Sequence, residues 1–314
     1  DGIRDFCLSR GLGDVYKRQI QAVMSGTQDI VIGGGVEVMS MVPIGAAVTD
    51  GYNAGHGLPF DSDGMKERYP NIFFSQFTGA ELVADKWNLS REDLDKFAME
   101  SHQKAAHATE SKYFDKEILP VEGKNAEGIN DLVMADEGIR FDASLDKLAG
   151  LKPVTEGGVI TAGNASQITD GAAAVVICND AGLKKIQSNP RAEIVSISVV
   201  GDDPVFMLTG PIPASKKALE TANLTIDDMD LYEVNEAFAP VPLAWADDLK
   251  ADKSKLNVNG GAMALGHPLG ATGAKLMTTL LHEMERREST YGLQAICEGC
   301  LLYTSDAADE EDSV

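Results

Sequence analysis

Apolar runs of strand length alternate with helical stretches along the second half of this chain, and no other sequence feature limits its possible folds so strongly. The strand-like runs are Ala172–Cys178, Glu193–Val200, Asp230–Val234 and Gln294–Glu298, and the helical stretches are Ser215–Ala222 and Gly270–Arg287. A helix between two strands lets the chain return and start the next strand in the same direction. The alternation therefore predicts an α/β core with mostly parallel strands.

The first half begins with a short apolar run, Asp29–Ile32, followed by the triplet Gly33-Gly-Gly35. This pattern predicts a buried strand that ends where two backbones approach closely. Residues 41–165, here called the insert, are richer in glycine, proline, aromatic and charged residues. We expect the insert to lie over the core as a loop-rich cap.

The clearest helix of the insert starts at Ser90, where Asp93 follows in a capping arrangement. Its apolar face is formed by Leu94, Phe97, Ala98, Ala105 and Ala108. His102 and His107 lie on the same helix, but their spacing is a poor one for sharing a metal ion. We expect both histidines to be solvated, and the sequence predicts no metal site.

The two ends of the chain are related to each other at the level of DNA. One codon choice for Asp14-Val-Tyr-Lys-Arg-Gln19 has a reverse complement that, read one base out of frame and completed by a T, encodes Cys300-Leu-Leu-Tyr-Thr-Ser305. Inverted repeats of this kind resemble the two arms of a translated sequencing adaptor. We therefore expect residues 1–19 and 300–314 to have no native role and to bury little, rather than to be a basic arm and an acidic tail.

Composition excludes several classes of protein. The 27 basic and 49 acidic residues give a net charge of −22, which repels nucleic acids. No apolar run is long enough to span a membrane, and no secretory signal opens the chain. Four cysteines in 314 residues are no disulfide framework. These features predict a cytoplasmic protein.

The most informative stretch is the glycine-rich segment from Asn257 to Lys275. Its glycines allow unusual dihedral angles and close backbone approach at a helix start. It is not a phosphate loop, since neither a Gly-Lys-Ser/Thr nor a Gly-x-Gly-x-x-Gly pattern is present. His267 stands between Gly266 and Pro268, a rigid turn that would direct one imidazole into a cleft. We interpret His267 as catalytic.

Two further motifs follow predicted strands. Asn235-Glu-Ala-Phe-Ala239 comes directly after Asp230–Val234, at the strand end where α/β folds place ligands, although Asn235 could also be a simple helix cap. Cys297-Glu-Gly299 ends another strand, and the glycine there allows close backbone approach. Cys178, in contrast, is interpreted as inert packing within an apolar strand.

Together these three motifs resemble the thiolase family. The match covers essentially residues 20–299, and four further segments carry it: Gly33-Gly-Gly-Val-Glu-Val-Met-Ser40, Thr161-Ala-Gly-Asn-Ala-Ser166, Asp170-Gly-Ala-Ala173 and Gly210-Pro-Ile-Pro-Ala-Ser215. The resemblance implies the thiolase fold, a duplicated αβαβα layered core with a loop-rich cap domain. It also implies acyl transfer between coenzyme A thioesters, by thiolytic cleavage of a 3-ketoacyl-CoA or by Claisen condensation.

The resemblance also implies roles for individual residues. Cys297 matches the acid/base cysteine, and His267 matches the histidine that activates the nucleophile and donates to the thioester oxygen. Asn235 matches the residue that holds a water as second donor, and the backbone N–H of Gly299 matches a donor to the acyl-enzyme oxyanion. Ser166 and Phe238 match contacts with the pantetheine arm. No cofactor is implied beyond coenzyme A itself, which is a substrate.

The sequence departs from the family pattern at its nucleophile. The family's nucleophilic cysteine lies about one helix before the strand here written Asp29–Ile32, where the adaptor-like segment stands. Cys7, in Asp-Phe-Cys-Leu, does not match it. We therefore expect the N-terminal part of the fold to be missing and the chain as written to be inactive.

The resemblance divides the chain into six parts. They are an adaptor artefact (1–19), a remnant of the N-terminal half (20–42), the loop or cap domain (43–166), a return to the N-terminal half (167–190), the C-terminal half (191–299) and a second adaptor artefact (300–314). The expected partners are acyl-CoA, CoA and further copies of the chain in a homodimer or homotetramer.

Two other functions remain open at this point. A non-catalytic thiolase-like protein that binds acyl-CoA or lipid would tend to alter the Asn-Glu-Ala-Phe element, which this sequence keeps at Asn235–Phe238. A ketoacyl synthase would use a different histidine-containing triad without Cys297. The insert does not indicate the acyl chain length of the substrate, although its general character is typical of degradative enzymes.

Overall fold

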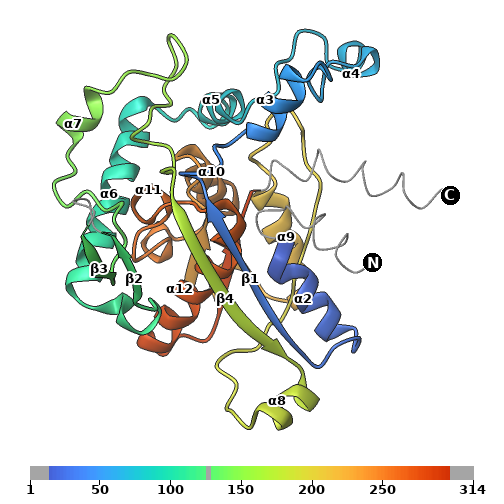
Figure 1. Cartoon of the computed structure of the whole chain (residues 1–314), viewed down its shortest axis with the longest axis vertical. Helices are drawn as coiled ribbons and strands as arrows, with labels where there is room; N and C mark the ends of the chain where they lie inside the picture. Colours follow the sequence, from blue (N-terminus) through green and yellow to red (C-terminus); the bar gives the residue numbers. More distant parts are fainter. Residues whose placement is uncertain (1–13, 125–128, 298–314) are drawn as a thin grey trace.

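The computed structural model describes residues 14–124 and 129–297 (Figure 1). The first part of the chain forms α2 (Asp14–Met24), β1 (Ile30–Val38), α3 (Ala46–Asn53), α4 (Asp63–Arg68), α5 (Gln76–Lys86), α6 (Arg91–Glu110), η1 (Tyr113–Lys116), β2 (Val121–Lys124), β3 (Asn130–Val133), α7 (Leu145–Ala149) and β4 (Asp170–Cys178). The second part forms α8 (Asp180–Ile186), α9 (Pro211–Ala222), η2 (Ile226–Asp228), β5 (Leu231–Val234), α10 (Pro240–Leu249), η3 (Lys253–Lys255), α11 (Ala262–Leu265), η4 (Leu269–Ala271), α12 (Thr272–Arg287) and β6 (Gly292–Ala295).

Strands β5 and β6 form a short parallel pair. Their register runs from Leu231 opposite Gly292 to Val234 opposite Ala295, and α12 packs against both strands. Because α12 follows β5 and precedes β6, this part is the strand–helix–strand arrangement that the sequence predicts. The carboxyl ends of the two strands therefore lie at the same end of the pair.

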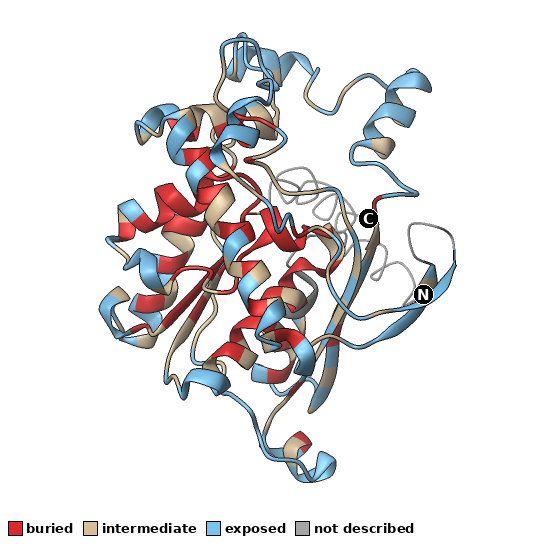
Figure 2. Ribbon diagram, turned by 90° about the vertical axis from the view of Figure 1, so that its left-hand side faces the viewer, coloured by how far each residue is buried: buried red, intermediate tan, exposed pale blue. Residues whose placement is uncertain are grey.

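The main core surrounds this pair. Its main apolar cluster joins buried residues of α5, α6, α9 and α10 to those of β5 and β6. Buried residues gather in the interior of the ribbon, whereas much of its periphery is intermediate or exposed (Figure 2). The rings of Tyr232 and Trp245 meet edge to face with centroids 5.3 Å apart. The indole N–H of Trp245 donates to the hydroxyl of Ser215 over 2.9 Å, so the largest core side chain keeps its polar group satisfied.

The expectation of mostly parallel strands is wrong for the described residues. Strands β1 and β4 pair antiparallel from Ile30 opposite Cys178 to Val38 opposite Asp170, and β2 pairs antiparallel with β3. β4 follows the whole insert, which brings the chain back in the opposite direction. Periodicity marks a strand but carries no information on its direction, so this difference could not be predicted.

Strand β1 also differs from its predicted form. It continues through Gly33-Gly-Gly35 instead of ending there, and its outward face is exposed, with Ile32 69% accessible. The glycines serve close approach within the strand: a Cβ at Gly35 would lie 1.8 Å from the carbonyl oxygen of Gly270. One face of β1 packs against α2 and α12, and the other has no cover in the part of the chain that the structure describes.

The predicted strand at Glu193–Val200 does not form. The segment is unpaired irregular backbone in the described structure, although Ile194 and Ile197 still pack against a small apolar cluster with Ile20. Alternating apolar residues identify a segment that buries one side, but a strand also needs a neighbour to complete its hydrogen bonds. That neighbour is absent among the described residues.

Helix α6 confirms the predicted cap and apolar face, but not the solvation of His102. Ser90 and Asp93 form a reciprocal capping box, and the five predicted face residues are buried. His107 is exposed as expected, whereas His102 is buried and its Nδ1 accepts the backbone N–H of Arg140 at 3.1 Å. His102 stands four residues after Ala98 on the same stripe, so the helical period itself directs it inward.

The adaptor-like N-terminal segment is partly helical. Residues 14–19 form the beginning of α2 and run directly into Ile20, which is buried. Of the described side chains, Arg18 is exposed and Lys17 and Gln19 are half-buried. The segment is thus helical with side chains that range from half-buried to exposed, and its lack of a native role stays a prediction. Residues 1–13 and 300–314 lie outside the described residues.

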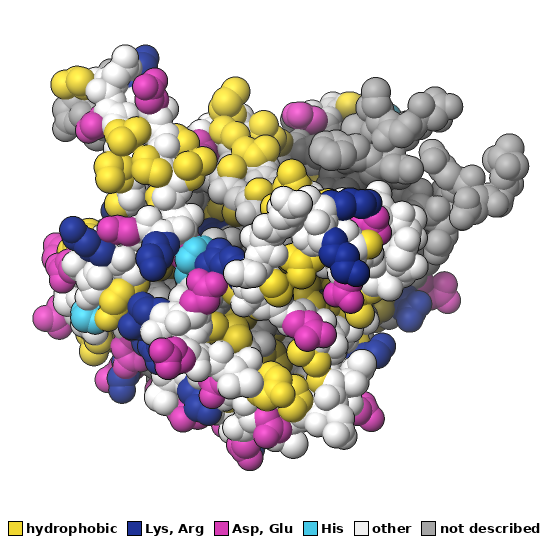
Figure 3. All heavy atoms as spheres, turned by 90° about the horizontal axis from the view of Figure 1, so that it is seen from below, with side chains coloured by type: hydrophobic (Ala, Val, Ile, Leu, Met, Phe, Trp, Pro, Cys, Tyr) yellow, Lys and Arg dark blue, Asp and Glu magenta, His cyan; other side chains and the backbone are white. Residues whose placement is uncertain are grey.

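The surface carries charges of both signs and scattered apolar side chains. On the face shown in Figure 3, acidic and basic groups are interspersed and hydrophobic groups reach the surface between them. No helix of the described chain has the length and apolarity needed to cross a bilayer. Within residues 14–124 and 129–297, no group of three metal-ligating side chains comes together.

Replacing Glu233 of β5 by glutamine should remove a pH-dependent loss of stability. Burial, with a smaller contribution from nearby Glu236, raises the pKa of Glu233 well above its ordinary value of 4.5. The folded protein therefore holds this proton more tightly than the unfolded chain, and wild-type stability falls as the pH rises from the unfolded toward the folded pKa. The slope should be at most about 1.4 kcal/mol per pH unit.

Urea unfolding from about pH 4 to about pH 8 checks this prediction. The Glu233→Gln variant should gain stability relative to wild type as the pH increases. Glu122→Gln, which changes an exposed carboxyl on β2, is the matched control and should show no such gain. A constant difference between Glu233→Gln and wild type across this range would contradict the prediction.

Candidate active site

Asn235 and Cys297 leave the core at the same edge of the β5–β6 pair. The backbone N–H of Asn235 donates to the carbonyl of Ala295 over 2.9 Å, which continues the strand ladder by one residue. Cys297 follows Ala295 by two residues and is 7% exposed. Both motifs therefore lie at the carboxyl ends of parallel strands, where α/β folds collect their functional groups.

The glycine-rich segment reaches this edge through two tight turns. Gly260 and Gly266 both have φ of +79°, which favours glycine, and each is also closely packed. A Cβ at Gly266 would lie 2.2 Å from the hydroxyl of Thr169. The single helical turn α11 stands between these two glycines. His267 follows the second turn and is only 7% exposed.

Two side chains fix the orientation of the imidazole. Thr272, the first residue of α12, lies with its hydroxyl 2.7 Å from His267 Nδ1. That hydroxyl donates its only hydrogen to the carbonyl of Pro268 over 2.9 Å. It must therefore accept from the histidine, which assigns the hydrogen to Nδ1 and leaves the lone pair on Nε2.

The lone pair of His267 Nε2 faces the amide of Asn235. The Asn235 Nδ2 lies 3.3 Å from Nε2, and both side chains are buried. The other end of the same amide, Oδ1, is buried with no hydrogen-bond partner in the described structure. A buried acceptor of this kind can be satisfied by a water molecule or by a donor on a ligand.

Burial keeps His267 neutral. It lowers the pKa of the imidazole to about 4, and the charge of Lys275, one turn along α12, acts in the same direction. A neutral imidazole whose Nε2 carries no hydrogen can accept a proton from a thiol. Once protonated, the same atom becomes a hydrogen-bond donor.

Ser166 and Phe238 lie side by side next to this centre. The backbone N–H of Ser166 donates to the carbonyl of Ala237 over 2.9 Å, and Ala165 forms an antiparallel bridge with Phe238. The ring of Phe238 meets Phe77 of α5 edge to face, with centroids 5.4 Å apart. The two residues predicted to touch the pantetheine arm therefore come together from segments far apart in the sequence.

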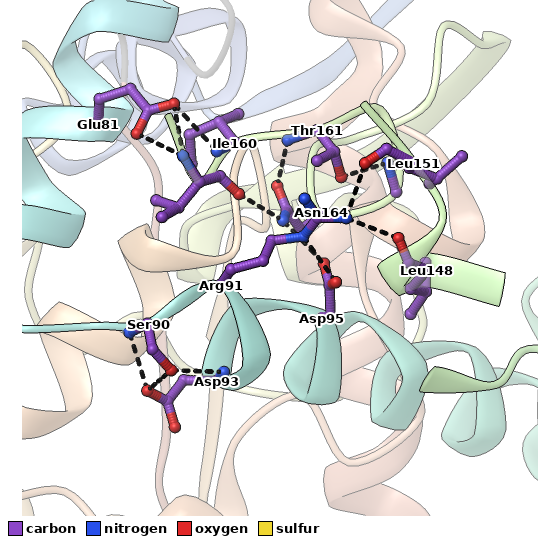
Figure 4. A network of polar contacts seen from close by, with 12 residues as sticks. Glu81, Ser90, Arg91, Asp93, Asp95, Leu148, Leu151, Ile160, Thr161 and Asn164 are labelled. Atoms are coloured by element: carbon purple, nitrogen blue, oxygen red, sulfur yellow. Dashed lines mark hydrogen bonds and ion pairs between the residues drawn. The ribbon is translucent and has the colours of Figure 1, made fainter. Parts of the chain in front are cut away.

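A buried polar network holds the segment that carries Ser166 (Figure 4). The side chain of Asn164 accepts the N–H of Thr161 over 2.8 Å and donates to Asp95 of α6 over 2.9 Å. Arg91, one turn before on the same helix, pairs with Asp95 and donates to two carbonyls near α7. The insert is thus tied directly to the backbone beside Phe238.

The structure brings together most of the predicted site. Asn235 and His267 are in direct contact, Cys297 lies at the same strand edge, and Ser166 adjoins Phe238. Asn235, His267, Cys297 and Phe238 are buried, and Ser166 is half-buried. Gly299 lies outside the described residues. Sequence reasoning missed Thr272, although its position one helical turn after Pro268 is a usable signal.

The sequence matches two family models that together span most of the chain. The first is "Thiolase, N-terminal domain", over residues 2–181, and the second is "Thiolase, C-terminal domain", over residues 188–303. The chain belongs to the thiolase family. The first match covers nearly all of the adaptor-like segment 1–19, and the second extends to residue 303, so the artificial origin of the two terminal segments stays a prediction that these matches do not support.

Characterised thiolases are similar along nearly the whole chain. A steroid 3-ketoacyl-CoA thiolase of Mycobacterium tuberculosis is 50% identical over 280 residues, which cover 89% of this chain and 67% of the relative. An acetyl-CoA acetyltransferase of Shinella zoogloeoides is 44% identical over 283 residues, covering 89% and 72%. The crystal structure of human mitochondrial 3-ketoacyl-CoA thiolase superposes with a TM-score of 0.80 at 36% identity, covering 92% of this chain and 74% of that one.

These matches establish a thiolase fold and a thiolase enzyme. The activity of the family is acyl transfer between coenzyme A thioesters, and this is the function of the protein. The human enzyme has also been solved in complex with CoA, with a TM-score of 0.79 to this chain. A ketoacyl synthase is no longer a candidate, because both halves of the chain match thiolase domains.

Replacing Thr272 by valine should release the imidazole of His267 from its fixed orientation. The variant leaves a buried Nδ1–H without an acceptor, which costs about 1 to 3 kcal/mol of stability. Nitrogen NMR of the ring should show hydrogen on Nδ1 in the wild type and a changed pattern in Thr272→Val. The matched control is Thr278→Val on the same helix, whose hydroxyl donates only to the carbonyl of Ala274. Equal ring spectra for all three proteins would refute the assignment.

Proposed function

We propose that Asn235, His267 and Cys297 perform the proton transfers and the oxyanion contact of thioester acyl transfer. The observation that carries this proposal is the buried contact of His267 Nε2 with Asn235. It joins a neutral proton acceptor to an amide whose other end has no partner in the described residues. Such a pair can first accept a thiol proton and then stabilise charge on a thioester oxygen.

Thiolysis transfers the acyl group twice, first to a cysteine sulfur and then to the sulfur of CoA. A cysteine thiol gives its proton to His267 Nε2, and the resulting thiolate attacks the keto carbon of a 3-ketoacyl-CoA. The bond between C2 and C3 breaks, leaving the acyl group on sulfur and negative charge on acetyl-CoA. The thiol of Cys297 supplies the proton to C2. The Cys297 thiolate then takes the proton of incoming CoA, whose sulfur attacks the acyl-enzyme. The carbon–sulfur bond to the enzyme breaks, acyl-CoA leaves, and the released cysteine thiolate takes back its proton from His267.

The remaining site residues would hold the substrate. Ser166 and Phe238 would lie along the pantetheine arm, which their side-by-side position supports. The backbone N–H of Gly299 would donate to the acyl-enzyme oxyanion. Coenzyme A enters as a substrate, and the described residues offer no cluster of metal ligands. The names of the relatives include both steroid and short-chain substrates, so we propose a 3-ketoacyl-CoA without choosing its chain length.

The polypeptide of these 314 residues should show no thiolysis of acetoacetyl-CoA or of a longer 3-ketoacyl-CoA. We expect this because Cys7, in Asp-Phe-Cys-Leu, does not fit the family pattern for the nucleophile. Replacing residues 1–19 and 300–314 by the corresponding terminal segments of the Shinella zoogloeoides acetyl-CoA acetyltransferase should restore activity. In that active chain, His267→Ala should lower kcat by roughly 100- to 10,000-fold and Asn235→Ala by roughly 100- to 1,000-fold.

Three results would count against this assignment. Turnover by the 314-residue chain would mean that its nucleophile is elsewhere. Full activity of His267→Ala would remove the histidine from the mechanism. If the extended chain binds CoA but turns over neither substrate, the alternative of a non-catalytic acyl-CoA or lipid-binding protein is favoured.

We also propose a cytoplasmic homodimer or homotetramer. Association is supported by the apolar outward face of β1 and β4, where Ile32, Val36 and Val176 are exposed. The location is supported by the small number of cysteines and by the similarity to a cytosolic acetyl-CoA acetyltransferase of Rattus norvegicus. Light scattering should give at least twice the 33.4 kDa mass of one chain. A monomer at all concentrations would contradict the assembly.

A further inference from the structure

The carboxylate of Glu236 is buried where three segments of the chain meet. One oxygen accepts the amide of Asn257 over 2.8 Å. The other accepts the hydroxyl of Ser101 over 2.7 Å and the backbone N–H of Met263 over 3.1 Å. Glu236 is 1% exposed and adjoins Asn235 in the sequence, so a group beside the reaction centre contacts both the glycine-rich segment and the insert.

Ser101 completes the connection from the insert side. It lies on the inner face of α6, is buried, and accepts the backbone N–H of Gly261 over 3.0 Å while donating to Glu236. The approach is so close that a Cβ at Gly261 would lie 2.2 Å from the Glu236 carboxylate. A Cβ at Gly260 would lie 2.5 Å from the carbonyl oxygen of Ser101. This packing leaves no room for the glycine-rich segment to move independently of α6.

The restraint continues to the catalytic histidine. Glu236 holds the N–H of Met263, and the side chain of Gln167 donates to the carbonyl of the same residue over 2.6 Å. Met263 belongs to the single turn α11, whose last residues are bonded back to Gly261 and Ala262. His267 comes two residues after that turn. Any shift of Gly261 or Met263 is therefore passed to the imidazole within one turn of helix.

We propose that Ser101 and Glu236 are positioning residues that set the place of His267 relative to Asn235, and that α6 of the insert controls this placement through the Ser101 hydroxyl. The inference rests on the proposed role of His267 in catalysis. Neither residue touches the imidazole: both act through the backbone of Gly261 and Met263. The insert is thus part of the catalytic geometry and not only a cover over it.

The experiment compares two serine variants of α6 in the 314-residue chain. Ser101→Ala removes the link, whereas Ser90→Ala removes the cap of the same helix without touching the glycine-rich segment. Amide hydrogen exchange should become at least about ten-fold faster at Gly261 and Met263 in Ser101→Ala, and the ring nitrogen signals of His267 should shift. Ser90→Ala should lower Tm while leaving both readouts as in wild type.

A second variant covers the case in which Ser101→Ala does not fold. Glu236→Gln keeps the shape of the side chain but replaces one accepting oxygen by a donor, so it should produce the same exchange and ring-nitrogen changes. Unchanged His267 signals in the folded variants, or equal changes in Ser90→Ala and Ser101→Ala, would overturn the proposal. These readouts need no turnover, so their failure is distinct from a failure of the catalytic assignment.

Discussion

The complete burial of β5 is the constraint on which the rest of the structure depends. All four of its residues are buried, and a buried backbone has to find its hydrogen-bond partners inside the protein. Strand β6 supplies them along one edge. On the other edge the side chain of Asn257 accepts the N–H of Val234 and donates to its carbonyl, each over 2.9 Å. One amide side chain thus takes the place of a peptide group from a neighbouring strand.

Because the side chain of Asn257 takes the place of a neighbouring strand, the glycine-rich segment has to come close to the core. Asn257 has a φ of 43° and begins the turn that leads the backbone away from β5, while its side chain keeps the contact. The segment then has to pass between Glu236 and α6, where only glycine fits at positions 260 and 261. As a result His267 is buried, and this burial lowers the pKa of its imidazole to about 4. The chemistry of the histidine is therefore a consequence of how β5 is completed.

The sequence predicts the local features that depend on neighbouring residues. The capping box at Ser90, the strand before Asn235 and the contact of Asn235 with His267 all follow from motifs of a few residues or from the family resemblance that these motifs carry. Features that depend on distant partners were not predictable. The antiparallel direction of β4 and the failure of Glu193–Val200 to form a strand are decided by which segment lies alongside, and periodicity does not report that.

The same limit applies within the site. As a polar residue, His102 is expected to be exposed. It lies instead on the apolar face of α6, where it is buried and accepts the N–H of Arg140. Thr272 is one threonine among many until the carbonyl of Pro268 takes its hydroxyl hydrogen and forces it to accept from His267. Both roles come from the pairing of donors with acceptors in a closed space. Such pairing is fixed only once the backbone is in place.

Two glutamates of the same short stretch show how this pairing selects one geometry. Burial raises the pKa of both Glu233 and Glu236, but only Glu236 faces three donors that act in the opposite direction. A buried carboxylate with three donors is satisfied in one arrangement of the surrounding segments and is strongly penalised in others. An apolar residue at position 236 could pack equally well against a displaced glycine-rich segment, because hydrophobic contact has no direction. A carboxylate there therefore favours the single register in which α6, β5 and the turn before His267 meet, and that register is the one that brings the imidazole to Asn235.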